Sequence, residues 1–351
     1  MICHHFRRRT KVYWRHLMTR NAGKTRFYVV ILSFLFLTLY CLGFTDYLFE
    51  KDFTEFQWPP FVNVHEQVVR QLLNEKSEYM YVNNWMDYDV YLEPSCLSNR
   101  LTRKKSLLIV VKTAPNRLQN RDGIRATWGK AFQYGNWRIR TVFVMGKMPF
   151  SEFKVYGNVL QAEQKQCDDL LVGDFYDGYR NNTLKFMHSI KYANSYCDSG
   201  TVPYVLLVDD DYFVSIPNLC SELEKHSPNE RLYMGWRFDS SPFRLSFAKH
   251  KISLDSYPFN KYPPYISAGA VLLTSQTIRE FFLAIQYVQL FPFDDVFAGI
   301  IAYQLGISPQ HSENFPFWGV DDASQSFARL IAVHGYSSQG LVNVYAKMNP
   351  N

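Results

Sequence analysis

Three consecutive carboxylates, Asp209-Asp210-Asp211, are the residues of this sequence best arranged to do chemistry. They directly follow the apolar run from Val202 to Val208. Such a run is typical of a strand buried on both faces, and open α/β sheets bind ligands beyond the carboxyl ends of these strands. Because like charges repel, the triplet needs a positive partner, and a divalent cation that holds a diphosphate would supply one. A solvated acidic turn is the ordinary alternative.

The elements that must position the triplet are indicated by short apolar runs that alternate with amphipathic stretches from Ser106 onward. This alternation predicts an α/β domain with a mainly parallel sheet flanked by helices. The predicted strands are 107–111, 141–145, 170–172, 202–208, 232–235, 270–273 and 328–333. The predicted helices are 122–128, 183–196, 216–224, 276–288 and 294–305, with a short one at 64–73 ahead of the sheet.

The positive charge of the chain is concentrated at its start. The formal charge is +6, but the first 44 residues hold eight Lys or Arg and no acid, which leaves 30 basic against 32 acidic residues in the rest. The body of the protein is therefore about neutral. We expect no nucleic-acid partner, since such partners require a basic surface.

An eighteen-residue run without charge, Phe27 to Phe44, follows this basic segment and is itself followed by Asp46 and Glu50. It is long enough to span a bilayer, and the basic residues before it fit the positive-inside rule. A core helix is rarely apolar all round, and no signal-peptide cleavage site follows the run. We predict a cytosolic tail (1–26), a transmembrane signal-anchor (27–44), a lumenal stem and lead-in (45–105) and a catalytic domain (106–351).

The predicted lumenal part holds four cysteines, Cys96, Cys167, Cys197 and Cys220. An oxidising compartment favours disulfides, but four cysteines allow three pairings and buried free thiols are the alternative. Asn181 begins an N-glycosylation sequon, which has meaning only if this part is lumenal.

Five segments, in order, resemble the motifs of the β-1,3-glycosyltransferases, a family of β-1,3-galactosyl- and β-1,3-N-acetylglucosaminyltransferases to which Fringe is distantly related. The segments are R-x-x-I-R-x-T-W-G at 121–129, D-F-x-D-x-Y-x-N-x-T-x-K at 174–185, D-D-D-x-F at 209–213, Y-P-x-Y-x-S-x-G at 262–269 and D-D-V-x-x-G at 294–299, where the family carries E-D-V-x-x-G. Ala268 and Ala270 stand where the family carries glycines, and Cys167 stands where it more often carries an aromatic residue. These departures leave the acidic motifs intact.

The resemblance implies a GT-A, Rossmann-like fold and an inverting transfer from a UDP-sugar that depends on Mn²⁺ or another divalent cation. Asp211 is the expected metal ligand, and His334 resembles the histidine that completes the family's metal site. Asp209 and Asp210 are expected to face the ribose and the donor sugar. An ordinary core or loop histidine is the alternative for His334.

The resemblance also implies that Asp295 is the general base that takes the proton of the acceptor hydroxyl. Capping of the 294–305 helix, whose N-terminal end favours acids, is the alternative for both Asp294 and Asp295. Arg121 and Arg125 lie four residues apart, just before and within one predicted helix, so both are expected to reach the phosphates of UDP. A surface pair that solvates one helical face is the alternative. Lys185 is expected to pair with the nucleotide or with Asp177.

The resemblance therefore predicts a single-pass type II Golgi protein that moves galactose from UDP-galactose in β-1,3 linkage onto a glycan of a glycoprotein or glycolipid. One alternative is transfer of N-acetylglucosamine or N-acetylgalactosamine by the same kind of site. Another is a membrane-bound lectin or chaperone that has lost catalysis, against which the intact acidic motifs argue. The oligomeric state is left open.

Overall fold

The computed structural model describes residues 24–77, 79–82, 89–95, 105–130, 132–148, 150–196, 200–321, 323 and 327–348, without the side chains of 150–155. The chain divides into two compact units. One contains the residues up to Phe56 together with Ser241–Lys261, and the other contains Gln57–Ser240 and the residues from Tyr262 onward. The predicted boundaries at residues 26, 44 and 105 stay predictions.

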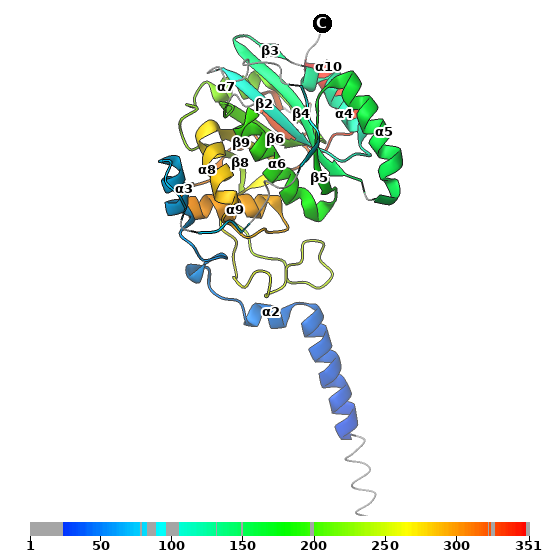
Figure 1. Ribbon diagram of the computed structural model, residues 1–351. Helices are drawn as coiled ribbons and strands as arrows, with labels where there is room; N and C mark the ends of the chain where they lie inside the picture. Colours follow the sequence, from blue (N-terminus) through cyan, green and yellow to red (C-terminus); the bar gives the residue numbers. More distant parts are fainter. Residues whose placement is uncertain are drawn as a thin grey trace, which may run out of the picture. The chain divides into compact units, whose positions relative to one another are not determined.

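The larger unit is built on a nine-stranded mixed sheet with the order β1-β5-β4-β2-β6-β9-β8-β10, and β3 pairs with β4 (Figure 1). Strands β5, β4, β2 and β6 run parallel at its centre, whereas β9 is antiparallel to both β6 and β8. The bounds are β1 Val90–Leu92, β2 Ser106–Lys112, β3 Gln133–Tyr134, β4 Trp137–Lys147, β5 Leu170–Tyr176, β6 Tyr204–Asp209, β8 Tyr233–Phe238, β9 Tyr265–Thr274 and β10 Gln310–His311.

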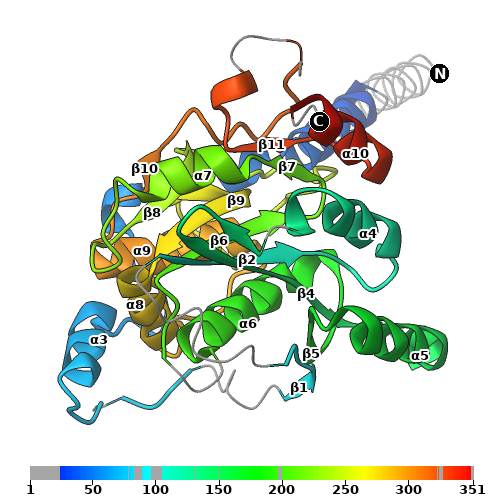
Figure 2. The same ribbon diagram turned by 90° about the horizontal axis from the view of Figure 1, so that it is seen from above.

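Helices cover both faces of this sheet, which explains why β2 is buried along its whole length. In Figure 2, α4, α7 and α10 lie on one side of the sheet, while α6 and α8 lie on the other. The bounds are α3 Val64–Leu72, α4 Leu118–Ala126, α5 Phe150–Cys167, α6 Asn182–Asn194, α7 Ile216–Leu223, α8 Ser275–Ile285, α9 Asp294–Leu305 and α10 Ser338–Met348. The predicted α/β class, with a sheet flanked by helices, is confirmed.

Two strands stand outside this sheet and matter for the site. Strand β7 (Tyr212–Val214) pairs antiparallel with β11 (Ala332–His334) to form a separate two-stranded sheet. The sequence predicted one strand over 328–333, but the chain first forms a 3-10 turn at Phe327–Arg329. The pairing with β7 then places the last residue of β11 beside the acidic triplet.

The remaining differences from the expected elements are local. Helix α9 has the predicted bounds, but α4 begins at Leu118, four residues before the predicted start. Helices α5 and α10 were not predicted. In α5, Val159 is exposed while the adjacent Leu160 is buried. The apolar residues of α5 therefore do not all lie on one buried face, and for this reason its sequence shows only a weak helical pattern.

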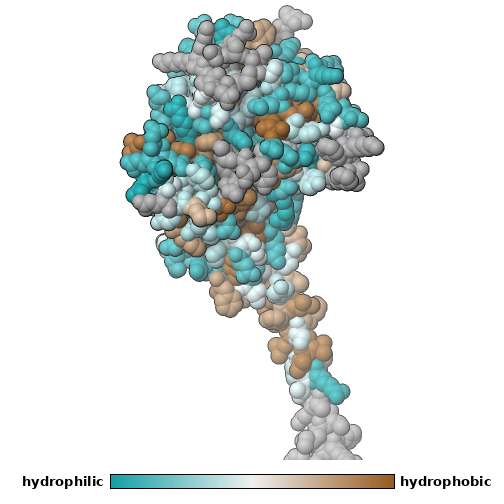
Figure 3. All heavy atoms as spheres, viewed as in Figure 1, coloured by the Kyte–Doolittle hydropathy of each residue, from teal (hydrophilic) through white to brown (hydrophobic). Residues whose placement is uncertain are grey.

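The described part of the smaller unit starts with an apolar helix, Lys24–Cys41, which is long enough to cross a membrane and is not buried (Figure 1). The predicted N-terminal apolar helix is thus confirmed, three residues earlier than the expected 27–44. Hydrophobic side chains gather along it in Figure 3. A short helix, α2 (Phe44–Leu48), follows, and residue Lys51 forms a parallel bridge with Phe259.

Candidate active site

The first acid of the triplet is held where two parallel strands end. Asp209 ends β6 and pairs in register with Lys112, which ends β2. The ammonium of Lys112 lies 3.1 Å from Asp209 Oδ1 and 2.7 Å from Asp294 Oδ2. Burial disfavours the charged ammonium, but the two carboxylates outweigh it and raise the pKa of Lys112. One buried cation therefore joins the end of β6 to the first residue of α9.

Asp210 is buried and fully engaged by the segment that follows β2. The Nε and Nη2 atoms of Arg117 lie 2.7 Å from Asp210 Oδ2 and Oδ1, respectively, and the Thr113 hydroxyl donates to Oδ2 at 2.5 Å. This planar, two-pronged contact is the geometry in which arginine binds carboxylates best. Asp210 therefore fixes Arg117 at the N-terminal end of α4, where two of its five N–H donors are used.

Asp211 meets His334 through the pairing of β7 with β11. The register sets His334 opposite Tyr212, and Nε2 of His334 lies 3.4 Å from Oδ2 of Asp211. The Asp211 carbonyl accepts from the N–H groups of Gly335 and Tyr336, each at 3.0 Å. Oδ1 of Asp211 is buried and has no hydrogen-bond partner in the described part of the chain. Asp211 and His334, the two residues predicted to bind a metal ion, are thus brought together, and Oδ1 of Asp211 is left without a hydrogen-bond partner.

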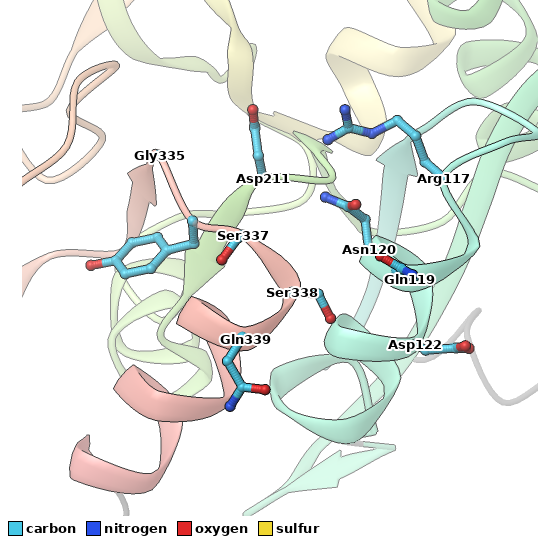
Figure 4. A pocket seen from close by; sticks show the side chains of 10 residues that line it. Arg117, Gln119, Asn120, Asp122, Asp211, Gly335, Ser337, Ser338 and Gln339 are labelled. Carbon is cyan, nitrogen blue, oxygen red and sulfur yellow. The ribbon is translucent and has the colours of Figure 1, made fainter.

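A cavity of about 760 Å³ opens beside this pair. Figure 4 shows Asp211 and Arg117 at one end of it, with Asn120 near them and Ser337, Ser338 and Gln339 of the α10 start on the facing side. Its volume is in the range of small-molecule sites. The lining groups are almost all polar, which suits a hydrophilic ligand.

Asp295 lies one residue into α9, in the first turn. Burial, and then the neighbouring Asp294 carboxylate, raise the pKa of Asp295 to about 7. The Asp295 carboxylate in turn contributes to the raised pKa of Tyr265, for which burial is the larger cause. Asp295 is a carboxyl group poised to exchange a proton near neutral pH. The capping alternative is also supported, because Oδ1 of Asp295 accepts from the N–H of Val296 in the first turn of α9 at 2.8 Å.

The two acidic motifs hold five carboxylates, those of residues 209–211, 294 and 295. Apart from His334, the basic side chains that form ion pairs with them in the described part of the chain are Lys112 and Arg117. The site is therefore rich in negative charge. Raising the pKa of Asp295 relieves part of this excess, and a bound cation would relieve more.

The structure places Arg121 and Arg125 differently from the sequence expectation that both reach the phosphates of UDP. Arg121 is completely buried, and its guanidinium donates to both oxygens of Glu163 at 2.7 Å and to the carbonyls of Ala114 and Pro115. Arg125 donates to Glu163 and to both oxygens of Asp169. Their donors are used inside the protein, so they hold α4 to its neighbours and are not available for phosphates. Arg117, which sequence reasoning missed, is the arginine that faces the cavity.

Lys185 follows the second of its two predicted roles. Its ammonium lies 2.9 Å from Asp177 Oδ1 and donates to the Thr113 carbonyl at 2.7 Å. The hydroxyl of the same Thr113 donates to Asp210. Lys185 therefore contacts the acidic triplet only indirectly, through Thr113. No contact of Lys185 with the cavity is seen.

The glycine at position 269 is required by close packing. A Cβ there would lie 2.0 Å from the hydroxyl of Tyr212, the residue that follows the triplet. The family-like segment 262–269 thus supports the site through packing. The alanines at 268 and 270 lie on either side of this point.

Aromatic side chains gather on the strands next to Asp295. Trp236 packs against His311 and Trp318 with ring centroids 4.6 and 4.5 Å apart, and Phe238 packs against Phe317 and against Tyr265. Phe317 and Trp318 remain 39% and 45% exposed. We name Trp236, Phe238, Tyr265, His311, Phe317 and Trp318 the aromatic wall.

Only two of the four cysteines in the predicted lumenal part lie among the described residues. Cys167 and Cys220 are free thiols, whereas Cys96 and Cys197 lie outside the described residues. Asn181 donates its side-chain amide to the Tyr176 carbonyl at 2.8 Å. Its glycosylation stays a prediction.

Comparison with known proteins bears directly on this site. The model of the galactosyltransferase family matches residues 119–313. The chain belongs to the galactosyltransferase family. It is therefore a glycosyltransferase, and the matched range includes the triplet and Asp295 but ends before His334.

Two relatives of this galactosyltransferase-family chain cover almost all of it, and a third covers two thirds. It is 34% identical to the β-1,3-galactosyltransferase bre-5 of Caenorhabditis elegans over 92% of this chain and 93% of that protein. It is 32% identical to the β-1,3-galactosyltransferase brn of Drosophila melanogaster over 88% and 90%. It is 31% identical to the mouse N-acetyllactosaminide β-1,3-N-acetylglucosaminyltransferase 4 over 67% and 65%.

Proposed function

We propose that the chain is an inverting, cation-dependent transferase that moves galactose from UDP-galactose in β-1,3 linkage onto a glycan acceptor. The observation that carries this proposal is the Asp211–His334 pair beside a polar cavity, together with the buried Lys112 that joins Asp209 of the same triplet to Asp294, the residue before Asp295. An acidic turn in open solvent would show neither a buried Asp210 nor an Asp211 that lines a cavity.

The donor atoms present fit a divalent cation that a substrate helps to hold. Asp211 offers one unsatisfied oxygen, and His334 offers a ring nitrogen nearby. No group of three or more His, Cys, Asp or Glu suited to a metal occurs in the described ranges, so the remaining ligands must come from phosphate and water. Mg²⁺ commonly uses one or two carboxylates plus substrate phosphates, and carboxylate and phosphate oxygens also suit Mn²⁺. Such a cation would neutralise charge on the departing diphosphate.

Three other side chains have distinct proposed roles in donor binding. Arg117 has N–H donors left for the phosphates of UDP, because its contact with Asp210 uses only two of them. Asp209 and Asp210 are proposed to face the ribose and the donor sugar. Lys112 holds Asp209 in place and is a positioning residue, since it is buried and contacts only the carboxylates.

The reaction then requires one base. The acceptor oxygen bonds to the anomeric carbon as the bond from that carbon to the UDP oxygen breaks, and UDP leaves with the electron pair. Asp295 takes the proton of the acceptor hydroxyl, for which a pKa near 7 is well suited. The aromatic wall is the proposed acceptor surface, because its member Tyr265 lies near enough to Asp295 for that carboxylate to help raise the pKa of Tyr265, and the exposed rings of the wall can stack on sugar faces.

We propose galactose as the donor sugar because two relatives that match nearly all of the chain, 92% and 88%, are the galactosyltransferases of C. elegans and D. melanogaster. The mouse N-acetylglucosaminyltransferases match 61% to 67%, and a mouse β-1,3-galactosyltransferase matches 69%. The N-acetylhexosamine donors remain the nearest alternative. An inactive lectin or chaperone is the more distant one.

The proposed setting is the Golgi membrane, in type II orientation. The helix Lys24–Cys41 supplies the span, and the basic residues before it favour a cytosolic N-terminus. The catalytic unit is then lumenal, where UDP-sugars and glycan acceptors meet.

A donor screen on the full-length chain in detergent tests this function. UDP-galactose, UDP-N-acetylglucosamine and UDP-N-acetylgalactosamine are each supplied with acceptor glycans, with Mn²⁺ present or chelated, and UDP release and transfer are measured. We expect fastest transfer from UDP-galactose and loss of transfer on chelation. Faster transfer from an N-acetylhexosamine donor would reassign the donor, and absence of turnover with every donor would favour the lectin alternative.

A further inference from the structure

The loop Ser241–Lys261 is joined to the end of the apolar N-terminal helix. The backbone N–H of Ser246 donates to the carbonyl of Cys41, the last residue of that helix, at 3.2 Å. Two residues later, Gly43 lies so close to Arg244 that a Cβ at position 43 would be 2.6 Å from the Arg244 carbonyl oxygen. Gly43 has a φ of 71°, which only glycine adopts readily. In Figure 1 the loop lies beside α2, which continues from this point.

Arg244 fixes the conformation of the loop from within. Its side chain is completely buried, and Nε donates to Glu50 Oε1 at 2.8 Å. The two Nη atoms donate to the carbonyls of Ile252, Tyr257 and Phe259 at 2.9 to 3.1 Å. A buried guanidinium that binds one carboxylate and three carbonyls leaves the loop little freedom.

Large apolar side chains point away from this fixed framework. Phe243 and Phe247, on either side of Arg244, are 54% and 76% exposed. Leu48 and Phe49, at the end of α2, are 64% and 75% exposed. We name Phe44, Leu48, Phe49, Phe243 and Phe247 the collar. Exposed apolar groups gathered in this way on a rigid surface indicate a partner that covers them.

We propose that the collar lies in the interfacial layer of the bilayer that the N-terminal helix crosses. This inference rests on the membrane span proposed above. The lipid is the occupant because the collar is continuous with the span: Phe44 is three residues beyond Cys41, and the loop is hydrogen-bonded to Cys41 itself. Residues bonded to the end of a span lie at the level of the bilayer surface, where aromatic rings are favoured.

The collar changes how the protein is attached to the membrane. A single helix alone leaves the following chain free to tilt and rotate. The loop between β8 and β9 adds a second contact with the bilayer, and it follows strand β8, which carries Trp236 and Phe238 of the aromatic wall. The smaller unit is therefore held to the membrane at two places.

Photo-cross-linking in full-length protein within vesicles tests the proposal. p-Benzoylphenylalanine replaces Phe247 in one variant and Phe132, which belongs to the larger unit, in another. The two side chains are 76% and 78% exposed, so the replacements are matched in access to solvent. We expect lipid adducts at position 247 at least about tenfold more abundant than at position 132.

A third variant separates this proposal from the span on which it rests. p-Benzoylphenylalanine at Leu35, within the apolar helix, reports whether the helix is in lipid. Adducts at 35 but not at 247, or equal adducts at 247 and 132, would overturn the collar proposal and leave the span intact. No adducts at 35 would overturn the span and the collar together. Because all three positions are exposed, the substitutions leave the core unchanged.

Discussion

Nε2 of His334 lies 3.4 Å from Oδ2 of Asp211, and this contact exists because β11 pairs with β7. The pairing also places the Gly335 and Tyr336 N–H groups on the Asp211 carbonyl. Side chain and main chain of Asp211 are thus both positioned by the segment that ends at Tyr336. In the proposed cation site these two residues would supply part of the ligands, and a substrate diphosphate would supply others.

His334→Ala should weaken the use of the cation more than it affects the fold. The Mn²⁺ concentration for half-maximal transfer should rise about tenfold or more, because a loss of about 1.4 kcal/mol in binding free energy corresponds to tenfold. The matched control is His65→Ala, at an exposed position of α3. An unchanged metal requirement in the His334 variant would remove this residue from the proposed metal site.

Asp295→Asn should reduce kcat by about 10²- to 10⁴-fold, the contribution usual for a general base. Binding of UDP should be nearly unchanged, since the base faces the acceptor. In the parent enzyme kcat/KM should rise with pH through an apparent pKa near 7, as Asp295 loses its proton. Retention of that rise in the variant would assign it to another group.

The same substitution should alter stability in a pH-dependent way. The pKa of Asp295 is raised in the folded state, so the folded protein binds more protons than the unfolded chain between about pH 4 and 7. Asp295 therefore lowers stability as pH rises through this range. Asp295→Asn should raise Tm by roughly 2 °C or more at pH 8 and change it little at pH 4. Scanning calorimetry of both proteins at the two pH values checks the sign.

Arg117→Lys should raise KM for the donor by about tenfold, because lysine keeps the charge but loses the planar fork that contacts Asp210. Half of the Arg117 side chain remains accessible, so the fold should be largely retained. Donor titrations, with circular dichroism as a control of folding, measure this. An unchanged KM would place the phosphates elsewhere.

Arg121→Met should lower the stability of the fold and leave the KM for the donor nearly unchanged, the opposite of Arg117→Lys. Removing one partner of the buried Arg121–Glu163 pair should cost about 3 kcal/mol of folding free energy. Activity per folded molecule should be nearly unchanged, because the guanidinium of Arg121 binds Glu163, Ala114 and Pro115, none of which lines the cavity. Urea unfolding compared with donor KM separates the two effects. A normal Tm with a raised KM would restore the nucleotide role that the sequence predicted for Arg121.

The sequence did not show which of Arg117 and Arg121 is buried and which one faces the cavity. Both arginines stand near the start of one helix, and the family-like motif draws attention to Arg121. The helix begins earlier than expected, at Leu118, which places Arg117 at its exposed end. Whether an arginine is buried depends on partners that are remote in sequence, here Glu163 for one and Asp210 for the other. No local pattern reports those partners.

The sequence by itself determined the apolar N-terminal helix, the central strands and the place of the acidic triplet after β6. These features are local, because a run of apolar residues and its flanking charges act within a few neighbours. Tertiary structure alone decided that Lys112 joins Asp209 to Asp294, that Asp210 holds Arg117 and that residues 241–261 return to the end of the first helix. Such contacts follow from strand pairing and burial, which bring distant residues together only when the whole chain is folded.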